Sequence, residues 1–422
     1  MRALPLVSAA FLGAILGFVS GCALLGQDAG PAKRGLAIVG GTIYVTPTDP
    51  PIKNGVVLIQ DGKISAVGSH ASLRIPPDFQ ALDCSGKTIT AGFWNSHVHF
   101  FERKWANASA IPSPELTRQL QEMFTRYGFT SVFDTGSPWD NTLRIRKRIE
   151  SGDAFGPRIR STGEVLIAPA AMPADSVLAI LGDMPLRNRE VTSAAEVEQA
   201  SKQLLQMGVD GIKIHLQPPP PPKPAFPRDG IRAAVTLAHE SNKPVFVHPN
   251  SGADVIAAVQ AGVDIIAHTT PQSGPWDASL AEAMKHRSVA LTPTLTLWES
   301  TMRHDRFSTQ ERFTAIAIGQ LQFWIASGGS VLFGTDIGAI DYDPSEEYVL
   351  MSRAGLNFGQ ILASLTTTPA AKFGDSARLG RIAAGFEADL VVLRGDPSRD
   401  VKVLAAVAYT VQGGKLIYRS NE

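Results

Sequence analysis

Five short apolar stretches of this chain each end at or near a side chain that can ionise. The first is Phe93–His99, which carries two histidines separated by one residue, and the others end near Lys213, His248, His268 and Asp336. Each stretch is rich in β-branched or aromatic residues, which is typical of strands. A single histidine at a strand end is more often a packed core residue than a ligand. Five such ends in series indicate parallel strands that bring these groups to one edge of a sheet.

The two histidines of the first stretch are expected to act together. His97 and His99 lie two positions apart, and alternate residues of a strand point to the same face. Two neutral imidazoles directed at one point make half of a metal site. His215 follows Lys213 by two residues, so it is expected to face the same side. It is predicted to bind substrate, and support of the metal ligands is an equally open interpretation.

The middle of the chain alternates strand and helix patterns, which indicates βα units and a parallel sheet. Eight strands are predicted, near Phe93–His99, Thr130–Asp134, Arg158–Gly163, Gly211–His215, Val245–His248, Asp264–His268, Val289–Leu295 and Val331–Thr335. Eight βα units are the number in a TIM barrel, whose catalytic groups lie at the C-terminal strand ends. The flanking segments hold only short strand patterns, including Val401–Tyr409 near the C-terminus.

Composition limits the partners of the chain. It carries 39 basic and 39 acidic residues, and 44% of its residues are hydrophobic. This balance excludes the charge excess typical of nucleic-acid binding and allows a large core. The expected partner is a small-molecule substrate, and self-association stays open.

The ordered set of ionisable groups resembles the amidohydrolase superfamily of metal-dependent hydrolases, and within it the imidazolonepropionase-like and Xaa-Pro dipeptidase-like enzymes. The resemblance runs from about Leu36 to Ile417 and includes Asp61–Gly68, Gly86–Gly92, Pro293–Leu295 and Gly385–Leu393. It implies an α/β fold, a (β/α)8 TIM barrel over residues 93–372 with a small β-sandwich domain built from residues 36–92 and 373–422. One departure is Asn95, where many members carry aspartate, but that position is not a metal ligand in the family.

The resemblance also implies a catalytic centre with two divalent metal ions, zinc being the expected metal. His97, His99 and Asp336 would hold the more buried ion, and His248 and His268 the other. A water shared between the ions would become the attacking hydroxide. Asp336 would then carry its proton to the leaving nitrogen.

Lys213 is the unusual member of the set, because an ammonium group repels a cation. The resemblance implies that carbon dioxide carboxylates its amine to N6-carboxylysine, an anion able to bridge two ions. The alternative is an unmodified lysine paired with Asp336 or another carboxylate.

The expected activity is metal-dependent hydrolysis of an amide bond, in a dipeptide or an N-acyl amino acid. A cyclic amide or lactone is the alternative substrate. An inactive barrel that binds ligands as a surface lipoprotein is the alternative from another class. No clear arginine or tyrosine pair for a peptide carboxylate is evident in the sequence, which weakens the dipeptidase interpretation.

The N-terminus predicts the location of the protein. Arg2 precedes an apolar stretch that ends in Val19-Ser20-Gly21-Cys22, which resembles a bacterial lipoprotein signal. Residues 1–21 would be a signal peptide and residues 22–35 a tether lipidated on Cys22. The mature protein would lie on the periplasmic side of the outer membrane, held by its lipid alone. An ordinary secretory signal or an anchor helix is the alternative.

A proline run, Pro218–Pro222, follows the predicted Lys213 strand directly. Proline gives a stiff, extended segment that cannot form a helix or a central strand. The run is interpreted as a loop that shapes the substrate pocket, with a polyproline partner motif as the alternative.

Overall fold

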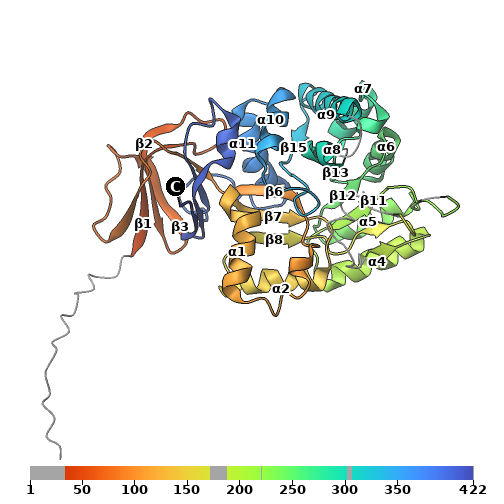
Figure 1. Cartoon of the computed structure of the whole chain (residues 1–422), viewed down its shortest axis with the longest axis horizontal. Helices are drawn as coiled ribbons and strands as arrows, with labels where there is room; N and C mark the ends of the chain where they lie inside the picture. The colour runs from red at the N-terminus through yellow and green to blue at the C-terminus, as the bar shows by residue number, and fades with distance from the viewer. Residues whose placement is uncertain (1–33, 172–187, 220, 302–306, 422) are drawn as a thin grey trace, which may run out of the picture.

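The computed structural model describes residues 34–171, 188–219, 221–301 and 307–421. They form an α/β fold in which helices surround two parallel sheets, with a mixed sheet at one side of the molecule (Figure 1). The signal-peptide and lipidation predictions, including Cys22, fall outside the described residues. In the described part, no helix combines the length and the apolar character needed to cross a bilayer.

The mixed sheet unites the two ends of the described chain. Its eight strands are β1 (Gly35–Ile43), β2 (Ile52–Gln60), β3 (Lys63–Ser69), β4 (Phe79–Asp83), β5 (Thr88–Ala91), β16 (Leu390–Leu393), β17 (Val407–Gln412) and β18 (Lys415–Arg419). Their order is β18-β17-β16-β5-β1-β2-β3, with β4 paired to β1. One buried cluster contains Ile38, Ile89 and Leu390, so apolar burial joins both segments. The two segments thus pair in one mixed sheet, where the sequence predicts a small β-sandwich domain.

One predicted strand near the C-terminus is wrong in its first half. Residues Val401–Ala405 form the 3-10 helix η4, and β17 begins only at Val407. The side chain of Asp400 accepts a hydrogen bond from the backbone N–H of Lys402, which caps this turn. A side-chain cap of this kind outweighs the β-branched composition of the segment.

The parallel strands include all eight that the sequence predicts. One sheet contains β6 (Phe93–Val98), β7 (Phe129–Asp134) and β8 (Arg158–Ser161); the other contains β9 (Leu166–Ile167), β10 (Arg189–Glu190), β11 (Ile212–His215), β12 (Val245–His248), β13 (Ile265–Ala267), β14 (Ala290–Thr292) and β15 (Ser330–Val331). Their orders are β6-β7-β8 and β10-β9-β11-β12-β13-β14-β15. The two-residue strands β9 and β10 were not predicted, because two residues carry no periodic pattern.

Helices alternate with these strands. They are α1 (Ser113–Met123), α2 (Trp139–Glu150), α4 (Ala194–Met207), α5 (Gly230–Glu240), α6 (Gly252–Ala261), α7 (Ala278–His286), α8 (Thr296–Thr301), α9 (Phe307–Ala326), α10 (Ser345–Arg353), α11 (Phe358–Leu365) and α12 (Thr367–Lys372). Their boundaries follow capping chemistry. Ser193 and Ser251 cap the N-termini of α4 and α6, and Gly208 and Gly262, both left-handed, end the same helices.

The strand pairing gives two parallel sheets where the sequence predicts one closed eight-stranded barrel. The last strand, β15, has two residues, and soon after it the N–H of Phe333 donates to the carbonyl of Ser364 at 3.0 Å instead of to β14. Backbone hydrogen bonds nevertheless link the sheets. The N–H of Ser96 donates to the carbonyl of Phe333 at 2.7 Å, and the N–H of Asp336 donates to that of His97 at 2.9 Å. The chain after β15 thus lies against β6.

A buried apolar cluster also spans both sheets. It contains Trp94 and Phe133 from the smaller sheet and Phe246 from the larger one, with Phe373 following α12. The ring centroids of Phe133 lie 4.7 Å from Phe246 and 4.9 Å from Phe373. The two sheets therefore share one core, and their C-terminal strand ends meet around one site.

Candidate metal centre

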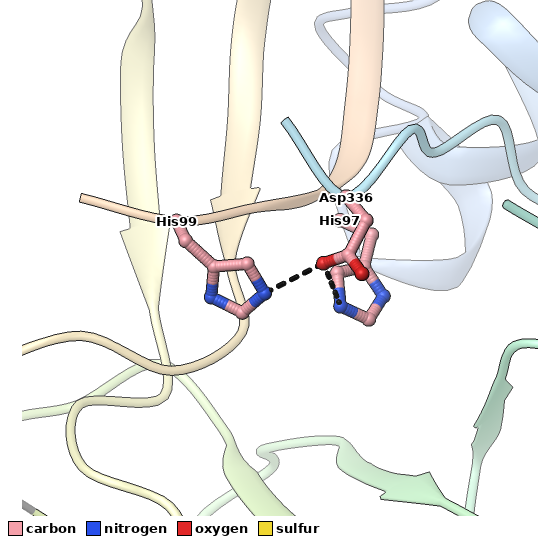
Figure 2. Close-up of side chains that lie close together, drawn as sticks. All are labelled: His97, His99 and Asp336. Atoms are coloured by element: carbon pink, nitrogen blue, oxygen red, sulfur yellow. Dashed lines mark hydrogen bonds and ion pairs between the residues drawn. The ribbon is translucent and has the colours of Figure 1, made fainter. Parts of the chain in front are cut away.

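The site forms where the parallel strands end. His97 lies on β6 and His99 just beyond it, while Asp336 follows β15. All three are buried, and their ligand atoms lie within 4.8 Å of one another. Figure 2 shows both imidazoles directed at the same carboxylate oxygen: the Nε2 atoms of His97 and His99 lie 3.3 Å and 2.8 Å from Oδ1 of Asp336. Among the described residues, no other group of three histidine, cysteine, aspartate or glutamate side chains brings its ligand atoms this close together.

The hydrogen bonds of His99 indicate that a cation belongs here. Its Nδ1 lies 2.9 Å from the carbonyl oxygen of Gly136, and a carbonyl can only accept, so Nδ1 carries the proton. In the neutral ring, Nε2 then presents a lone pair to the carboxylate oxygen of Asp336, 2.8 Å away. The lone pairs of this nitrogen and this oxygen repel each other at such a distance unless a proton or a metal ion lies between them. The donor set therefore fits a divalent metal.

Asn95 holds the first histidine in place. Its amide nitrogen donates to Oγ1 of Thr335 at 2.8 Å, and its Oδ1 accepts the N–H groups of His97 and Thr335 at 3.2 and 3.3 Å. One side chain thus joins β6 to the segment that carries Asp336. The sequence suggested only that asparagine is tolerated there, and the structure gives it a positioning contact.

His268 and His248 continue the ring of histidines. His268 follows β13 with a φ of 77°, and its ring centroid lies 4.5 Å from that of His248 and 4.6 Å from that of His97. Oγ1 of Thr294 donates to the carbonyl of Pro293 at 2.9 Å, so it accepts from Nδ1 of His268 at 2.5 Å. This leaves Nε2 of His268 as the unprotonated nitrogen, which is what ligation requires.

Lys213 lines the same cavity as these histidines. It is on β11 and its side chain is buried, but Nζ has no hydrogen-bond partner among the described residues. Burial lowers the pKa of Lys213 to about 7, although the charge of Asp336 opposes this shift. A buried amine without a partner is costly. The free-amine form is therefore accessible near neutral pH, and the predicted ion pair with Asp336 is not among the pairs found in the described chain.

His215 differs from the candidate ligands in its protonation. The backbone N–H of Gln217 donates to Nδ1 of His215 at 3.2 Å, so the proton of the neutral ring lies on Nε2. Burial, with the charge of Lys213 adding to it, lowers the pKa of His215 to about 3. The ring is therefore neutral and offers a donor, which suits a hydrogen bond to an oxygen atom better than metal ligation.

The electrostatics of the remaining groups agree with ligation. Burial lowers the pKa of His97 and of His248 well below their ordinary value, and lowers that of His268 to about 3. Burial raises the pKa of Asp336, but its interactions with His99, His268 and Lys213 outweigh burial and lower the pKa to about 2. The imidazoles of His97, His248 and His268 are thus neutral and lie around one carboxylate anion.

All the predicted site residues except Cys22 line one cavity of about 430 Å³, namely His97, His99, Lys213, His215, His248, His268 and Asp336. The rest of its wall comes from loops at the same strand ends, including Gln217, Trp298 and Phe313. Gln217 directly precedes Pro218, but the described prolines of the Pro218–Pro222 run do not line the cavity. The position of that run beside the rim is as predicted; its role stays a prediction.

Two buried carboxylates support the site and were missed in the sequence. Asp134, at the end of β7, accepts hydrogen bonds from the hydroxyls of Ser137 at 2.6 Å and Ser161 at 2.7 Å and from the N–H of Gly136 at 3.2 Å. It thereby fixes the loop whose carbonyl accepts from His99. Its only sequence signal was an aspartate at a predicted strand end.

The second is Glu347 on α10. Its carboxylate accepts the N–H groups of Leu295 and Thr296 and the hydroxyl of Thr296, each at 2.9 Å. This fixes the backbone next to Thr294, which contacts His268 and has a φ of 44°. In the sequence, Glu347 stands in an acidic stretch with Asp341, Asp343 and Glu346, a composition typical of a solvated loop or a helix start.

A larger cavity, of about 1100 Å³, lies at the opposite end of the strands, where Arg158 begins β8 and Pro244 precedes β12. Several charged residues in its wall are ion-paired: Arg160 with Asp375 at 2.7 Å and Arg146 with Asp210 at 2.8 Å. It holds none of the histidines of the metal centre. Charges at this end of a parallel barrel usually contribute stability.

Together, the fold and the site define a class: an α/β protein with a candidate metal centre at the C-terminal ends of parallel strands. The chain belongs to the amidohydrolase family, whose sequence pattern matches residues 88–417. It is similar to the ochratoxinase of Aspergillus niger, with 24% identity over 409 residues, which cover 87% of this chain and 83% of that protein.

Solved structures give the same relationship. A Xaa-Pro dipeptidase with bound methionine superposes with a TM-score of 0.76 at 22% identity, over 92% of this chain and 100% of that one. A prolidase complexed with N-methylphosphonate-L-proline superposes with a TM-score of 0.74 at 26% identity, over the same shares of the two chains. The fold shared with these neighbours confirms the α/β prediction.

Proposed function

We propose that the protein is a metal-dependent hydrolase that cleaves an amide bond. The observation that carries the proposal is the convergence of His97, His99, Asp336 and three further ionisable ligand candidates on one cavity. Membership in the amidohydrolase family supports a hydrolase. Within this proposal the two parallel sheets act as one barrel, since they share a core and are linked by backbone hydrogen bonds.

The metal would be held by two sets of ligands. His97, His99 and Asp336 form the first set, and His248 and His268 belong to the second. These residues would hold divalent ions, zinc being the expected metal, which would supply an acidified water and polarise the scissile carbonyl. The second set has only two histidines, so it needs a further ligand to hold an ion.

Lys213 is the residue that completes the second set. Its Nζ is buried without a partner, and its pKa is lowered to about 7 by burial. An unprotonated amine can react with carbon dioxide, whereas an ammonium group cannot. Addition of carbon dioxide to the neutral amine, with release of one N–H proton, would give a carbamate anion with two oxygen atoms, which suits a metal ligand. The unpartnered nitrogen therefore supports N6-carboxylysine over a structural ion pair.

Two side chains act on the substrate in this proposal. The Nε2–H of His215 donates a hydrogen bond to the carbonyl oxygen as negative charge develops on it. Asp336 takes a proton from the attacking water and delivers it to the leaving nitrogen. A catalytically inactive ligand-binding barrel would need neither a proton carrier nor a donor at this position.

We also propose that the enzyme is anchored to the bacterial envelope through a lipid on Cys22, with the periplasmic side of the outer membrane as its location. The support is the Val19–Cys22 motif and the apolar stretch before it.

Hydrolysis is tested with the purified, zinc-loaded protein and parallel sets of dipeptides, N-acyl amino acids, neutral amides, lactams and lactones. Release of a free amine identifies C–N cleavage. The expected result is amide turnover that a chelator abolishes and zinc restores. Turnover of lactones alone would show that the protein cleaves ester bonds and not amide bonds. No turnover of any compound, with metal occupancy verified, would favour an inactive ligand-binding barrel.

A further inference from the structure

Within the described residues, the wall of the cavity at the metal centre carries little charge. Lys213 and Asp336 are the only lining residues of the described chain that are lysine, arginine, aspartate or glutamate, and both belong to the metal centre. Above them the described lining residues are aromatic, aliphatic or neutral polar. Neither an arginine nor a tyrosine lines the cavity within the described residues.

One part of the wall is apolar. It is formed by Phe101 after β6, by Leu297 and Trp298 of α8, and by Phe313 of α9. Phe101 stacks on His99, with ring centroids 4.8 Å apart, and Nε1 of Trp298 donates to Oγ1 of Thr269 at 2.8 Å. These contacts fix two large rings against the metal centre. Such a surface favours an aromatic or branched apolar group next to the scissile bond.

Another part of the wall carries carboxamides. Gln217 follows β11, Asn250 follows β12 and Gln272 follows β13, so neighbouring strands each present one amide; Asn188 lies at the start of β10. Among the described residues, no hydrogen bond engages the side-chain amides of Asn188, Gln217 or Asn250, so no described group competes with a ligand for them. Carboxamides both donate and accept, which matches neutral amide groups.

A free carboxylate on a substrate would meet a poor environment here. An anion that leaves water needs a cation or several charge-assisted donors in compensation. The described wall supplies no such cation outside the metal centre, where Lys213 and the proposed ions would be engaged with the scissile amide and the water. A neutral amide loses much less on entering an apolar cavity with carboxamide partners.

We propose that the substrate is an uncharged amide, with an aromatic or branched apolar group beside the scissile bond and no free carboxylate. This inference rests on the proposed amide hydrolysis and narrows it. It predicts that dipeptides and N-acyl amino acids are poorer substrates than their neutral derivatives.

The test uses substrate pairs that differ only in charge. N-benzoyl-L-leucine and N-benzoyl-L-leucinamide share the scissile bond, and release of benzoate reports its cleavage in both. We expect a kcat/KM at least about tenfold higher for the neutral compound, the cost of a modest electrostatic mismatch. Equal or higher kcat/KM for the acid would overturn the inference while leaving amide hydrolysis intact.

A binding measurement separates the two proposals. Calorimetry on the zinc-loaded protein gives the affinity of each compound whether or not it is cleaved. Preferred binding of the neutral compound without turnover would contradict the proposed hydrolysis and support the inference about the cavity. Preferred binding of the acid, or binding of neither, would contradict the inference.

A matched pair of variants tests the cause. Gln217→Arg adds a cation at the half-buried rim and keeps the backbone N–H that donates to His215; Gln217→Leu removes the amide without adding charge. We expect Gln217→Arg to shift the kcat/KM ratio at least about tenfold toward the acid, and Gln217→Leu to lower kcat/KM for the amide only. An unchanged ratio in the arginine variant would show that charge in the wall does not select the substrate.

Discussion

The imidazole rings of His215 and His248 stack with their centroids 3.9 Å apart and their planes 15° apart. The two residues are register partners on β11 and β12. Yet their roles differ in the proposed mechanism, since Nε2 of His215 is protonated and His248 is a candidate ligand. A variant that keeps the stacked ring and removes the donor can separate the two roles.

His215→Phe is that variant. Loss of one donor to a developing oxyanion typically lowers kcat by about 10²–10³, and we expect a loss of that size with unchanged metal content. Steady-state kinetics and elemental analysis on one sample make the measurement. A fall in bound metal would show instead that His215 is a ligand.

Lys213→Met tests the bridging group. Six ligand candidates exceed the four that one zinc ion requires, so we expect about two metal ions per chain in the native protein and about one in the variant. Elemental analysis gives both values. Two ions in the methionine variant would exclude a bridging role for this residue.

The same residue predicts a pH dependence for metal reloading. The pKa of Lys213 is lowered to about 7 by burial, so its ammonium form, which cannot take up carbon dioxide, predominates below that pH. Reactivation of the metal-free protein by zinc and bicarbonate should be faster at pH 8 than at pH 6. Equal rates at both pH values, or no effect of bicarbonate, would contradict carboxylation.

The sequence was sufficient to predict the strand ends and the groups on them. β-branched stretches ending in His248, His268 or Asp336 are local patterns, and the order of strands in a βα fold places their ends together. The positions of these side chains were therefore predictable before any contact was known.

Support contacts were not predictable in the same way. The carboxylate of Glu347 reaches Leu295 and Thr296 across 52 and 51 positions of sequence, and the contact depends on how α10 packs. The short length of β15 is accompanied by a hydrogen bond from the backbone N–H of Phe333 to Ser364, a residue far away in the sequence. The tautomer of His215 depends on one backbone N–H in the following loop.

Glu347→Gln tests the support of the loop next to His268. The carboxylate accepts three hydrogen bonds, and an amide leaves at least one buried donor poorly matched, which costs about 1–3 kcal/mol. We expect a lower free energy of unfolding for Glu347→Gln in urea. The control variant Glu346→Gln, at the neighbouring exposed position, should unfold like the native protein.

The pH dependence of this difference has a defined sign. Burial raises the pKa of Glu347 from 4.5 to about 7. A carboxyl group with a raised folded-state pKa stabilises the fold below its unfolded value and loses that contribution as the pH rises through 7. The gap in unfolding free energy between the native protein and Glu347→Gln should therefore narrow from pH 5 to pH 8. A gap that widens would mean that the hydrogen bonds outweigh burial.

Cys22→Ser tests the anchor. The proposed lipidation site precedes the first described strand, β1, and the candidate metal ligands begin some seventy residues after Cys22, so the serine variant should be soluble and fully active. Membrane fractionation and activity are measured together, with Cys84→Ala, a change in the buried core cysteine, as the control that stays in the membrane fraction. A serine variant that still fractionates with membranes would contradict lipidation at Cys22.

Asp336→Asn tests the proton carrier. The carboxylate lies 2.8 Å from Nε2 of His99 and is proposed both to ligate a metal and to move a proton, and an amide imitates only weak ligation. Loss of a general base costs about 10²–10⁴ in rate, so kcat should fall by at least that factor while substrate binding changes far less. Metal content on the same sample separates loss of the ion from loss of proton transfer. Near-native turnover with full metal would remove Asp336 from the mechanism, and with it the assignment of the site as a hydrolase centre of this family.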